Sequence, residues 1–173
     1  MPVFKGDEIW LQVTQGSIFT DDEANRIFNG QLILHNAPGA VIFCVYSKSG
    51  TYGSYITFQS TFVNIGGSII PSSGIFEAPV SGTYEFSFTT QSYSSGTCVI
   101  VYHNGIVAYY VYCEPTTYTS VSSKWIMNLQ KLDEVRLYAC NYMYANSDMY
   151  TVFSGKLIQK CESKSMYCFG IIY

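Results

Sequence analysis

Short apolar runs separated by clusters of Gly, Ser, Asn and Pro extend along most of the chain, and they constrain its fold more than any other feature. Apolar residues recur at the period of two that is typical of strands, as at Tyr84, Phe86 and Phe88. A helical period is nearly absent, and the acid-led segment 21–28 is long enough for only one or two turns. We therefore expect an all-β, two-sheet sandwich. The expected strands are 9–14, 27–34, 41–47, 56–64, 74–78, 82–91, 97–103, 106–113, 122–129, 134–140 and 150–159.

The composition excludes several classes of protein. Hydrophobic residues make up 48% of the 173 and charged residues only 12%, which is the opposite of the balance that disorder needs. The net charge is −3 and the 9 Lys and Arg residues do not cluster, so we expect no nucleic-acid partner. No apolar stretch approaches the roughly 18 residues that span a bilayer. The first eight residues carry charges ahead of any apolar segment, unlike a signal peptide.

Six cysteines bear on the compartment and on metal binding. They are Cys44, Cys98, Cys113, Cys140, Cys161 and Cys168. None forms a Cys-x-x-Cys pair, and His35 and His103 lie far from metal-ligand spacing, so we expect no metal site. An even number of cysteines in a Tyr- and Ser-rich β chain favours an oxidising compartment. The alternative is buried free thiols in a cytosolic protein.

Asn104-Gly105 marks a tight hairpin between 98–103 and 106–113, because Asn-Gly suits a two-residue type I′ turn. Direct pairing from His103 and Ile106 places Cys98 opposite Val111. Cys113 then lies on the same face as Cys98, two residues further along. A Cys98–Cys113 disulfide is therefore feasible with a small bulge or twist.

An internal repeat indicates the domain organisation. Residues 5–11 (KGDEIWL) resemble 131–137 (KLDEVRL), and 28–33 (FNGQLI) resemble 153–158 (FSGKLI) at nearly the same offset. We therefore expect four parts: residues 1–34 are the C-terminal strand pair of a preceding, truncated module, 35–39 are a linker, 40–160 are a complete module, and 161–173 are a Cys-containing tail.

Residues 62–67 (FVNIGG), 74–88 (GIFEAPVSGTYEFSF) and 153–157 (FSGKL) resemble the globular head domain of complement C1q. The family pattern Gly-x-Phe-x-Ala-Pro-x-x-Gly-x-Tyr-x-Phe-x-Phe is met at each fixed position of 74–88. The resemblance implies an antiparallel two-sheet jelly roll of the C1q/TNF-like type. The motif positions with an expected structural role are Phe62, Asn64, Gly66, Gly74, Phe76, Ala78, Pro79, Gly82, Tyr84, Phe86, Phe88, Phe153, Gly155 and Leu157.

The chain departs from the family pattern at two positions. Ile70 stands where an aromatic is usual, and Leu132 stands where glycine is usual, whereas the first repeat keeps that glycine as Gly6. No collagen-like run precedes the module, so the bouquet assembly of complement C1q is not implied.

The resemblance also bears on cysteine pairing. Cys98 and Cys113 are similar to a cysteine pair of one complement subunit. The family fold makes Cys98–Cys140 the second choice, because it places those two strands side by side. Cys161 and Cys168 either pair with each other or link chains.

Candidate catalytic and metal-binding groups are few. The two histidines lie in the linker and beside a hairpin turn, so a catalytic triad is not expected and we predict no enzyme. Adjacent carboxylates such as Asp133 and Glu134 point to opposite faces of a strand. Some family members carry calcium, but Asp21-Asp22-Glu23 lacks the alternating ligands and glycine of an EF-hand-like loop. We expect no cofactor, with calcium as the alternative.

The chain has sixteen tyrosines, most of them in its second half, and this high number suggests a functional role for some of them. Tyr109, Tyr110, Tyr142 and Tyr144 are candidates for a subunit interface or a ligand face. The alternative is that both sheets use Tyr where others use Phe. The resemblance implies a secreted, non-enzymatic recognition protein that forms homotrimers and binds protein or carbohydrate ligands, including in innate defence. A receptor ligand of TNF-like or synaptic-organiser type and a structural multivalent assembly protein are the alternatives.

Overall fold

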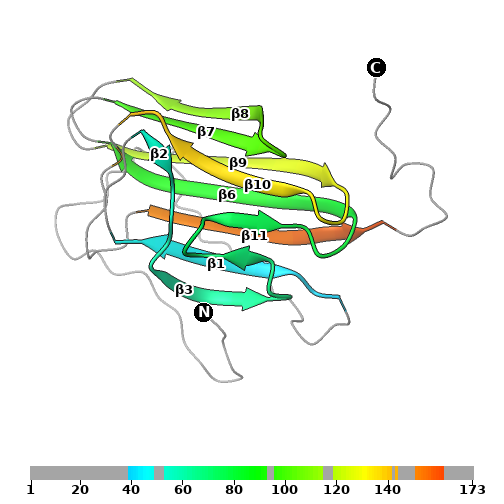
Figure 1. Ribbon diagram of the computed structural model, residues 1–173. Helices are drawn as coiled ribbons and strands as arrows, with labels where there is room; N and C mark the ends of the chain where they lie inside the picture. The colour runs from blue at the N-terminus through cyan, green and yellow to red at the C-terminus, as the bar shows by residue number, and fades with distance from the viewer. Residues whose placement is uncertain are drawn as a thin grey trace, which may run out of the picture. The chain divides into compact units, whose positions relative to one another are not determined.

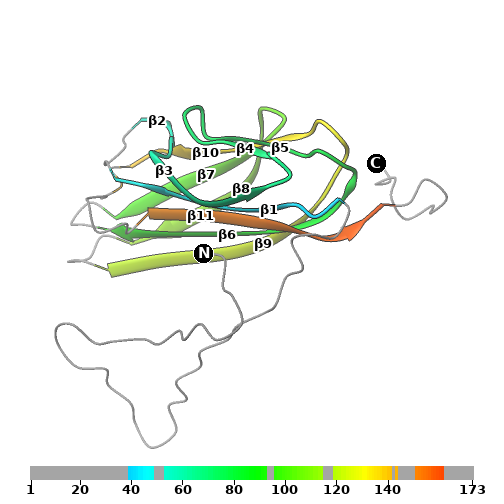
Figure 2. The same ribbon diagram turned by 90° about the horizontal axis from the view of Figure 1, so that it is seen from below.

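The computed structural model describes residues 39–48, 53–92, 96–114, 119–141, 143 and 151–161. All of them belong to one compact unit. The described residues form eleven strands and no helix, and Figure 2 shows them as two layers. The expected elements at 9–14, 21–28 and 27–34, and the linker up to residue 38, lie outside the described residues.

The first sheet has five antiparallel strands in the order β3-β1-β11-β6-β9. Its strands are β1 (Ile42–Ser47), β3 (Ser60–Ile65), β6 (Gly82–Ser92), β9 (Thr119–Leu129) and β11 (Thr151–Lys160). The C-terminal strand β11 lies near the centre, between β1 and β6 (Figure 1). Closing the sheet therefore requires the two ends of the domain to be in place.

The second sheet has the order β4-β5-β10-β7-β8, with β2 paired to β10. Its strands are β2 (Ser54–Tyr55), β4 (Ile69–Ile70), β5 (Ile75–Glu77), β7 (Thr97–His103), β8 (Ile106–Cys113) and β10 (Glu134–Ala139). The chain crosses repeatedly between the two sheets. This arrangement confirms the all-β, antiparallel sandwich that the turn pattern predicted.

The prediction of one strand over 56–64 was wrong. The structure places only the second half of this range in a strand, β3, whereas β2 ends before the range begins and the chain crosses between the sheets at Ile56–Phe58. Ile56 N–H still donates to the Leu137 carbonyl in the second sheet, whereas Gln59 N–H donates to the Tyr46 carbonyl in the first. The buried side chains of Ile56 and Phe58 fill the core at this crossing, which is why an apolar run there does not make one strand.

Aromatic side chains fill the space between the sheets. Tyr84, Phe86 and Phe88 of β6 are completely buried, as the period of two predicts. Phe76 of the second sheet meets Tyr84 at 5.4 Å and Phe86 at 5.1 Å between ring centroids, in edge-to-face geometry. Phe76 also meets Phe43 of β1 at 5.3 Å. One phenylalanine thus joins the second sheet to two strands of the first.

Gly155 leaves space for two of these rings. In β11 it pairs with Phe43 on one side and Phe86 on the other. A Cβ at this position would lie 2.5 Å from the Phe43 ring and 2.8 Å from the Phe86 ring. The absence of a side chain allows the rings of the two neighbouring strands to close over β11.

Candidate functional site: the exposed edge of the second sheet

Strand β8 forms the last strand of the second sheet and carries a concentration of exposed apolar side chains. Ile106 is 73% exposed, Tyr110 57% and Tyr112 60%. In Figure 1 this strand lies at the upper margin of the sheet, beside β7, and no described strand pairs with its other side. We call its exposed residues Ile106, Val107, Tyr109, Tyr110 and Tyr112 the β8 edge.

The β8 edge lacks the protection that edge strands usually carry. Its sequence, IVAYYVYC, contains no charged residue and no proline. Edge strands of monomers are usually blunted by such residues, because an open edge pairs with other chains. Contiguous exposed aromatics are, in addition, characteristic of interaction surfaces. The β8 edge therefore has the chemistry of a protein interface.

Tyr109 connects this edge to the core. Its ring stacks on Trp125 of β9 with centroids 5.8 Å apart, and the Ser123 hydroxyl donates to the Tyr109 hydroxyl at 3.3 Å. Trp125 in turn stacks on Phe86 at 5.8 Å and on Phe153 at 6.3 Å. The edges of the two sheets are thus held together by a ladder of rings, which gives the exposed edge a rigid base.

Of the predicted interface tyrosines, the structure places Tyr109 and Tyr110 on this edge, whereas Tyr142 and Tyr144 lie outside the described residues. Ile106, Val107 and Tyr112 belong to the same strand but were not among the predicted interface residues. The absence of charge from the whole run 106–113 was the signal that could have found them.

The predicted Cys98–Cys113 disulfide was wrong, because the hairpin contains a bulge. Tyr102 pairs with Val107 but Val101 pairs with Tyr109, which leaves Ala108 as an extra residue. Cys113 therefore lies opposite Thr97 rather than on the face of Cys98. A register change of one residue moves each later side chain to the other face of the sheet.

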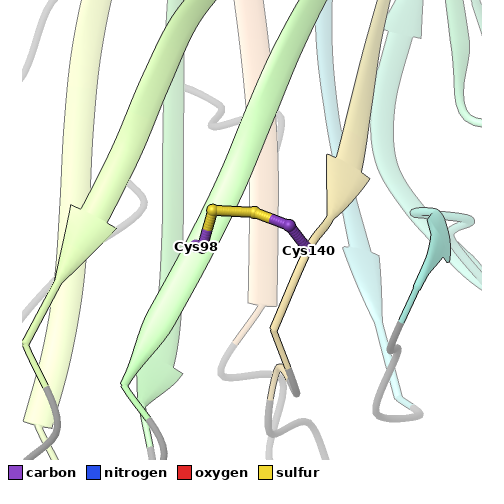
Figure 3. Close-up of a disulfide and its surroundings, with 2 residues drawn as sticks. All are labelled: Cys98 and Cys140. Atoms are coloured by element: carbon purple, nitrogen blue, oxygen red, sulfur yellow. A yellow bond between two sulfur atoms is a disulfide. The ribbon is translucent and has the colours of Figure 1, made fainter.

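Cys98 is instead bonded to Cys140 at the end of β10, which was the second choice (Figure 3). Their Cα atoms are 5.3 Å apart, within the range that a disulfide spans. Cys113 is a free thiol, and Cys161 is disulfide-bonded. Cys168 lies outside the described residues.

His103 and Asp133 form a structural pair at the opposite end of the β7–β8 hairpin. His103 Nε2 lies 3.0 Å from Asp133 Oδ2, and Asn104 donates to Asp133 Oδ1 at 2.8 Å. The Gln130 backbone N–H also donates to this carboxylate, which closes the turn before β10. Burial raises the pKa of Asp133, but these hydrogen bonds outweigh it and hold the pKa below its ordinary value. The carboxylate thus fastens two turns together.

Within the described ranges no group of three His, Cys, Asp or Glu residues could hold a metal ion. The candidate calcium ligands Asp21–Glu23 and the linker histidine His35 lie outside those ranges. No helix in the part of the chain that the structure describes is long and apolar enough to cross a membrane.

Comparison with known proteins identifies the family. The model of the C1q domain matches residues 42–158. The chain belongs to the C1q domain family. Over 110 residues, 61% of this chain, it is 34% identical to complement C1q tumor necrosis factor-related protein 3 of Mus musculus. The match covers 45% of that relative, so the chain spans about half the length of the curated relative it matches.

Solved structures agree on the fold. The globular domain of zebrafish complement 1qA protein aligns with a TM-score of 0.56 and 19% identity, over 70% of this chain and 99% of that one. Murine APRIL, crystallised at pH 5.0, aligns with a TM-score of 0.58 and 12% identity, over 69% of this chain and 99% of that one. At these identities the likeness shows the shared jelly roll alone.

Most of the C1q motif positions lie in the interior of the domain. Buried positions are Gly74, Phe76, Ala78, Gly82, Tyr84, Phe86, Phe88, Phe153 and Gly155; half-buried ones are Pro79 and Leu157; exposed ones are Phe62, Asn64 and Gly66.

Two hydrogen bonds and one backbone conformation explain the residue types at three positions of the C1q motif. The Asn64 side chain donates to the Ile69 carbonyl at 3.0 Å and so fastens the turn between β3 and β4. The Tyr84 hydroxyl donates to the Val80 carbonyl at 2.6 Å, which gives a buried phenol its partner. Gly74 has a φ of +69°, and a Cβ there would collide with the Ile56 carbonyl oxygen.

Leu132 occupies the position where the C1q pattern has glycine. Its φ is +74°, in the left-handed region that glycine adopts most easily. The side chain is 62% exposed, and its backbone N–H donates to the Ala78 carbonyl. The departure noted in the sequence is therefore a locally strained turn.

Proposed function

We propose that this chain is a non-enzymatic, extracellular recognition module that assembles as a homotrimer and binds protein or carbohydrate ligands, with innate defence as its setting. The uncharged, aromatic β8 edge is the observation that carries the proposal. Membership of the C1q domain family supports the ligand-binding role. The Cys98–Cys140 disulfide supports an oxidising compartment and hence secretion.

The trimer needs two different complementary patches, since a closed ring of three uses a head-to-tail contact. The β8 edge is the first patch. The outer face of the first sheet offers a second, because Ile126 of β9 is 62% exposed there. Beside it, Glu85 pairs with Lys124 at 2.9 Å and Lys156 at 3.4 Å, so part of the charge of this face is already neutralised. The absence of charge from the β8 edge and the pairing of charges on the second patch favour close association.

Sedimentation equilibrium tests the assembly against the 19.4 kDa chain mass. We expect a trimer at micromolar concentration that EDTA does not dissociate, with a contact of at least about 1,000 Å². Tyr110→Lys on the first patch and Ile126→Lys on the second should each give monomers. Ile70→Lys is the matched control, because Ile70 is 52% exposed at the other edge of the second sheet. A wild-type monomer would refute the proposed assembly.

Ligand class is tested with the trimer on arrays of glycans and microbial surfaces. Binding there supports pattern recognition, whereas binding confined to one cell-surface receptor favours a signalling ligand. Large assemblies that bind neither would indicate a structural protein, in which repeated weak contacts add avidity.

A further inference from the structure

Three tyrosines from three strands form a cluster on the outer face of the second sheet. The ring centroids of Tyr55 and Tyr138 are 5.5 Å apart, those of Tyr55 and Tyr102 are 5.9 Å apart, and those of Tyr102 and Tyr138 are 6.3 Å apart. All three contacts are edge-to-face, a favourable arrangement for aromatic rings. We call Tyr55, Tyr102 and Tyr138 the tyrosine triad.

Strand register brings the tyrosine triad to one face. Tyr138 of β10 pairs with Tyr55 of β2, and Arg136 of the same strand pairs with Tyr102 of β7. The intervening residues Leu137 and Val101 are buried in the core, so the triad points away from it. The ring ladder under Tyr109 lies on the opposite, inner face of this sheet, whereas Val107, Tyr110 and Tyr112 of the β8 edge share the outer face with the triad.

Arg136 supplies a cation at the tyrosine triad. Its guanidinium lies 3.8 Å from the centroid of the Tyr55 ring, and Nη2 donates to the Ser73 carbonyl at 3.1 Å. The buried Nε–H has no acceptor. A guanidinium has five N–H donors, so the terminal Nη groups retain donors for a ligand even though the buried Nε–H cannot reach one. A carboxylate is an acceptor that matches the planar guanidinium well.

The cluster is held in position before any ligand arrives. The Cys98–Cys140 disulfide joins β7 to β10, the strands that carry Tyr102 and Tyr138 (Figure 3). Tyrosine side chains have only two side-chain dihedral angles to fix. A rigid aromatic platform therefore loses little entropy when it binds.

The exposed area of the triad indicates the size of its ligand. Tyr55 is 38% exposed, while Tyr102 and Tyr138 are half-buried. For side chains of about 200 Å² each, the triad offers about 100–200 Å². A stable protein interface needs about 800 Å² on each partner. The triad thus suits one or two sugar rings, whose C–H faces pack on aromatic rings while their hydroxyls meet the phenol tips.

We propose that the tyrosine triad and Arg136 form a binding site for an acidic carbohydrate, in which the rings of the triad pack against sugar C–H faces and Arg136 receives the sugar carboxylate. The site rests on the proposed recognition function and adds a location and a ligand class to it. A ligand with a cationic group is disfavoured, because Arg136 would repel it.

Calorimetry with a matched pair of probes tests this site. The probes are hexagalacturonic acid and its full methyl ester, which share a sugar backbone and differ in charge. We expect the wild-type trimer to bind the acid at least 10-fold more tightly than the ester. Tyr102→Ala and Tyr138→Ala should each weaken binding of both probes at least 10-fold, and Tyr102→Phe by less than 3-fold, because it keeps the ring.

Arg136→Gln should abolish the preference for the acid and change binding of the ester by less than 3-fold. Tyr46→Ala is the matched control, because Tyr46 packs against Phe62 on the other sheet, and it should bind both probes as the wild type does. Circular dichroism and sedimentation of each variant separate loss of the site from loss of the fold.

The site is refuted if the wild-type trimer binds neither probe at millimolar concentration, or if the triad variants bind as tightly as the wild type. A protein ligand that depends on Tyr102 without any carbohydrate binding would also overturn it. In these cases the proposed recognition function still holds if the protein binds glycans or microbial surfaces on the arrays through another part of its surface. A trimer that binds nothing in any ligand class overturns both.

Discussion

Replacement of Gly155 by alanine tests how tightly the aromatic core is packed. The new methyl group would lie 2.5 Å from the Phe43 ring and 2.8 Å from the Phe86 ring, far inside van der Waals contact. Neither ring can move away easily, since Phe43 already meets Phe153 at 4.9 Å and Phe76 at 5.3 Å. We therefore expect the overpacking cost of about 1–3 kcal/mol that a filled core imposes.

Two effects set the expected net value. Alanine reduces the entropy of the unfolded chain relative to glycine, which offsets about 0.4–1 kcal/mol of the cost. The free energy of unfolding should therefore fall by about 1–2 kcal/mol. For a domain of this size that corresponds to a drop of roughly 4–8 °C in Tm.

Urea unfolding followed by tryptophan fluorescence, to which Trp125 stacked on Phe86 contributes, measures this change. Ser154→Ala is the matched control, because Ser154 is the preceding residue of β11 and lies on the half-buried outer face. It should change stability by less than about 0.5 kcal/mol. If Gly155→Ala is as stable as this control, the rings are not confined as described and the packing argument fails.

Four further predictions concern the turns, the disulfide and the domain boundary. Leu132→Gly should relieve the strain of a positive φ, so the free energy of unfolding from urea titration should stay the same or rise by up to about 1 kcal/mol. A decrease of more than about 0.5 kcal/mol would contradict the strained turn. Removing the Cys98–Cys140 disulfide, whose cysteines are 42 residues apart, should lower the free energy of unfolding by about 4 kcal/mol. Cys113→Ser should leave the disulfide pairing found by peptide mapping unchanged. The Asp133 carboxylate stabilises the fold at pH values above its unfolded pKa of about 3.9, and this contribution is lost as the pH falls through its lower folded pKa. In thermal melts below about pH 4, the Tm of Asp133→Asn should therefore depend less on pH than that of the wild type. Deletion of residues 1–38 should shift Tm by only a few degrees, as expected if 40–160 is a complete module, and loss of folding would disprove that boundary.

Much of the fold follows from patterns with a single physical cause. Tyr84, Phe86 and Phe88 alternate with polar residues, so their common face and their burial were readable from the sequence. The strand at 97–103 was predicted with the bounds that the structure has. By contrast, the crossing at Ile56–Phe58 was hidden, because an apolar run does not reveal to which sheet its backbone bonds.

The candidate site shows a sharper limit. Tyr109 and Tyr110 were identified from composition, but adjacent residues of a strand face opposite ways, so only the register shows that Tyr109 stacks on Trp125. The register itself depends on the unpaired Ala108, which is an ordinary alanine in an ordinary apolar run. The tyrosine triad comes from three strands that are distant in the chain, and no local pattern in the sequence connects them.

The bulge at Ala108 links the length of this hairpin to the pairing of the cysteines. Deletion of Ala108 would restore direct pairing along β8 and rotate Cys113 to the side of the sheet where Cys98 and Cys140 are bonded. Three sulfur atoms would then compete for one bond, and thiol–disulfide exchange would scramble the product during oxidative folding. In related chains, therefore, a cysteine at this place and an extra residue in the hairpin should be gained or lost together.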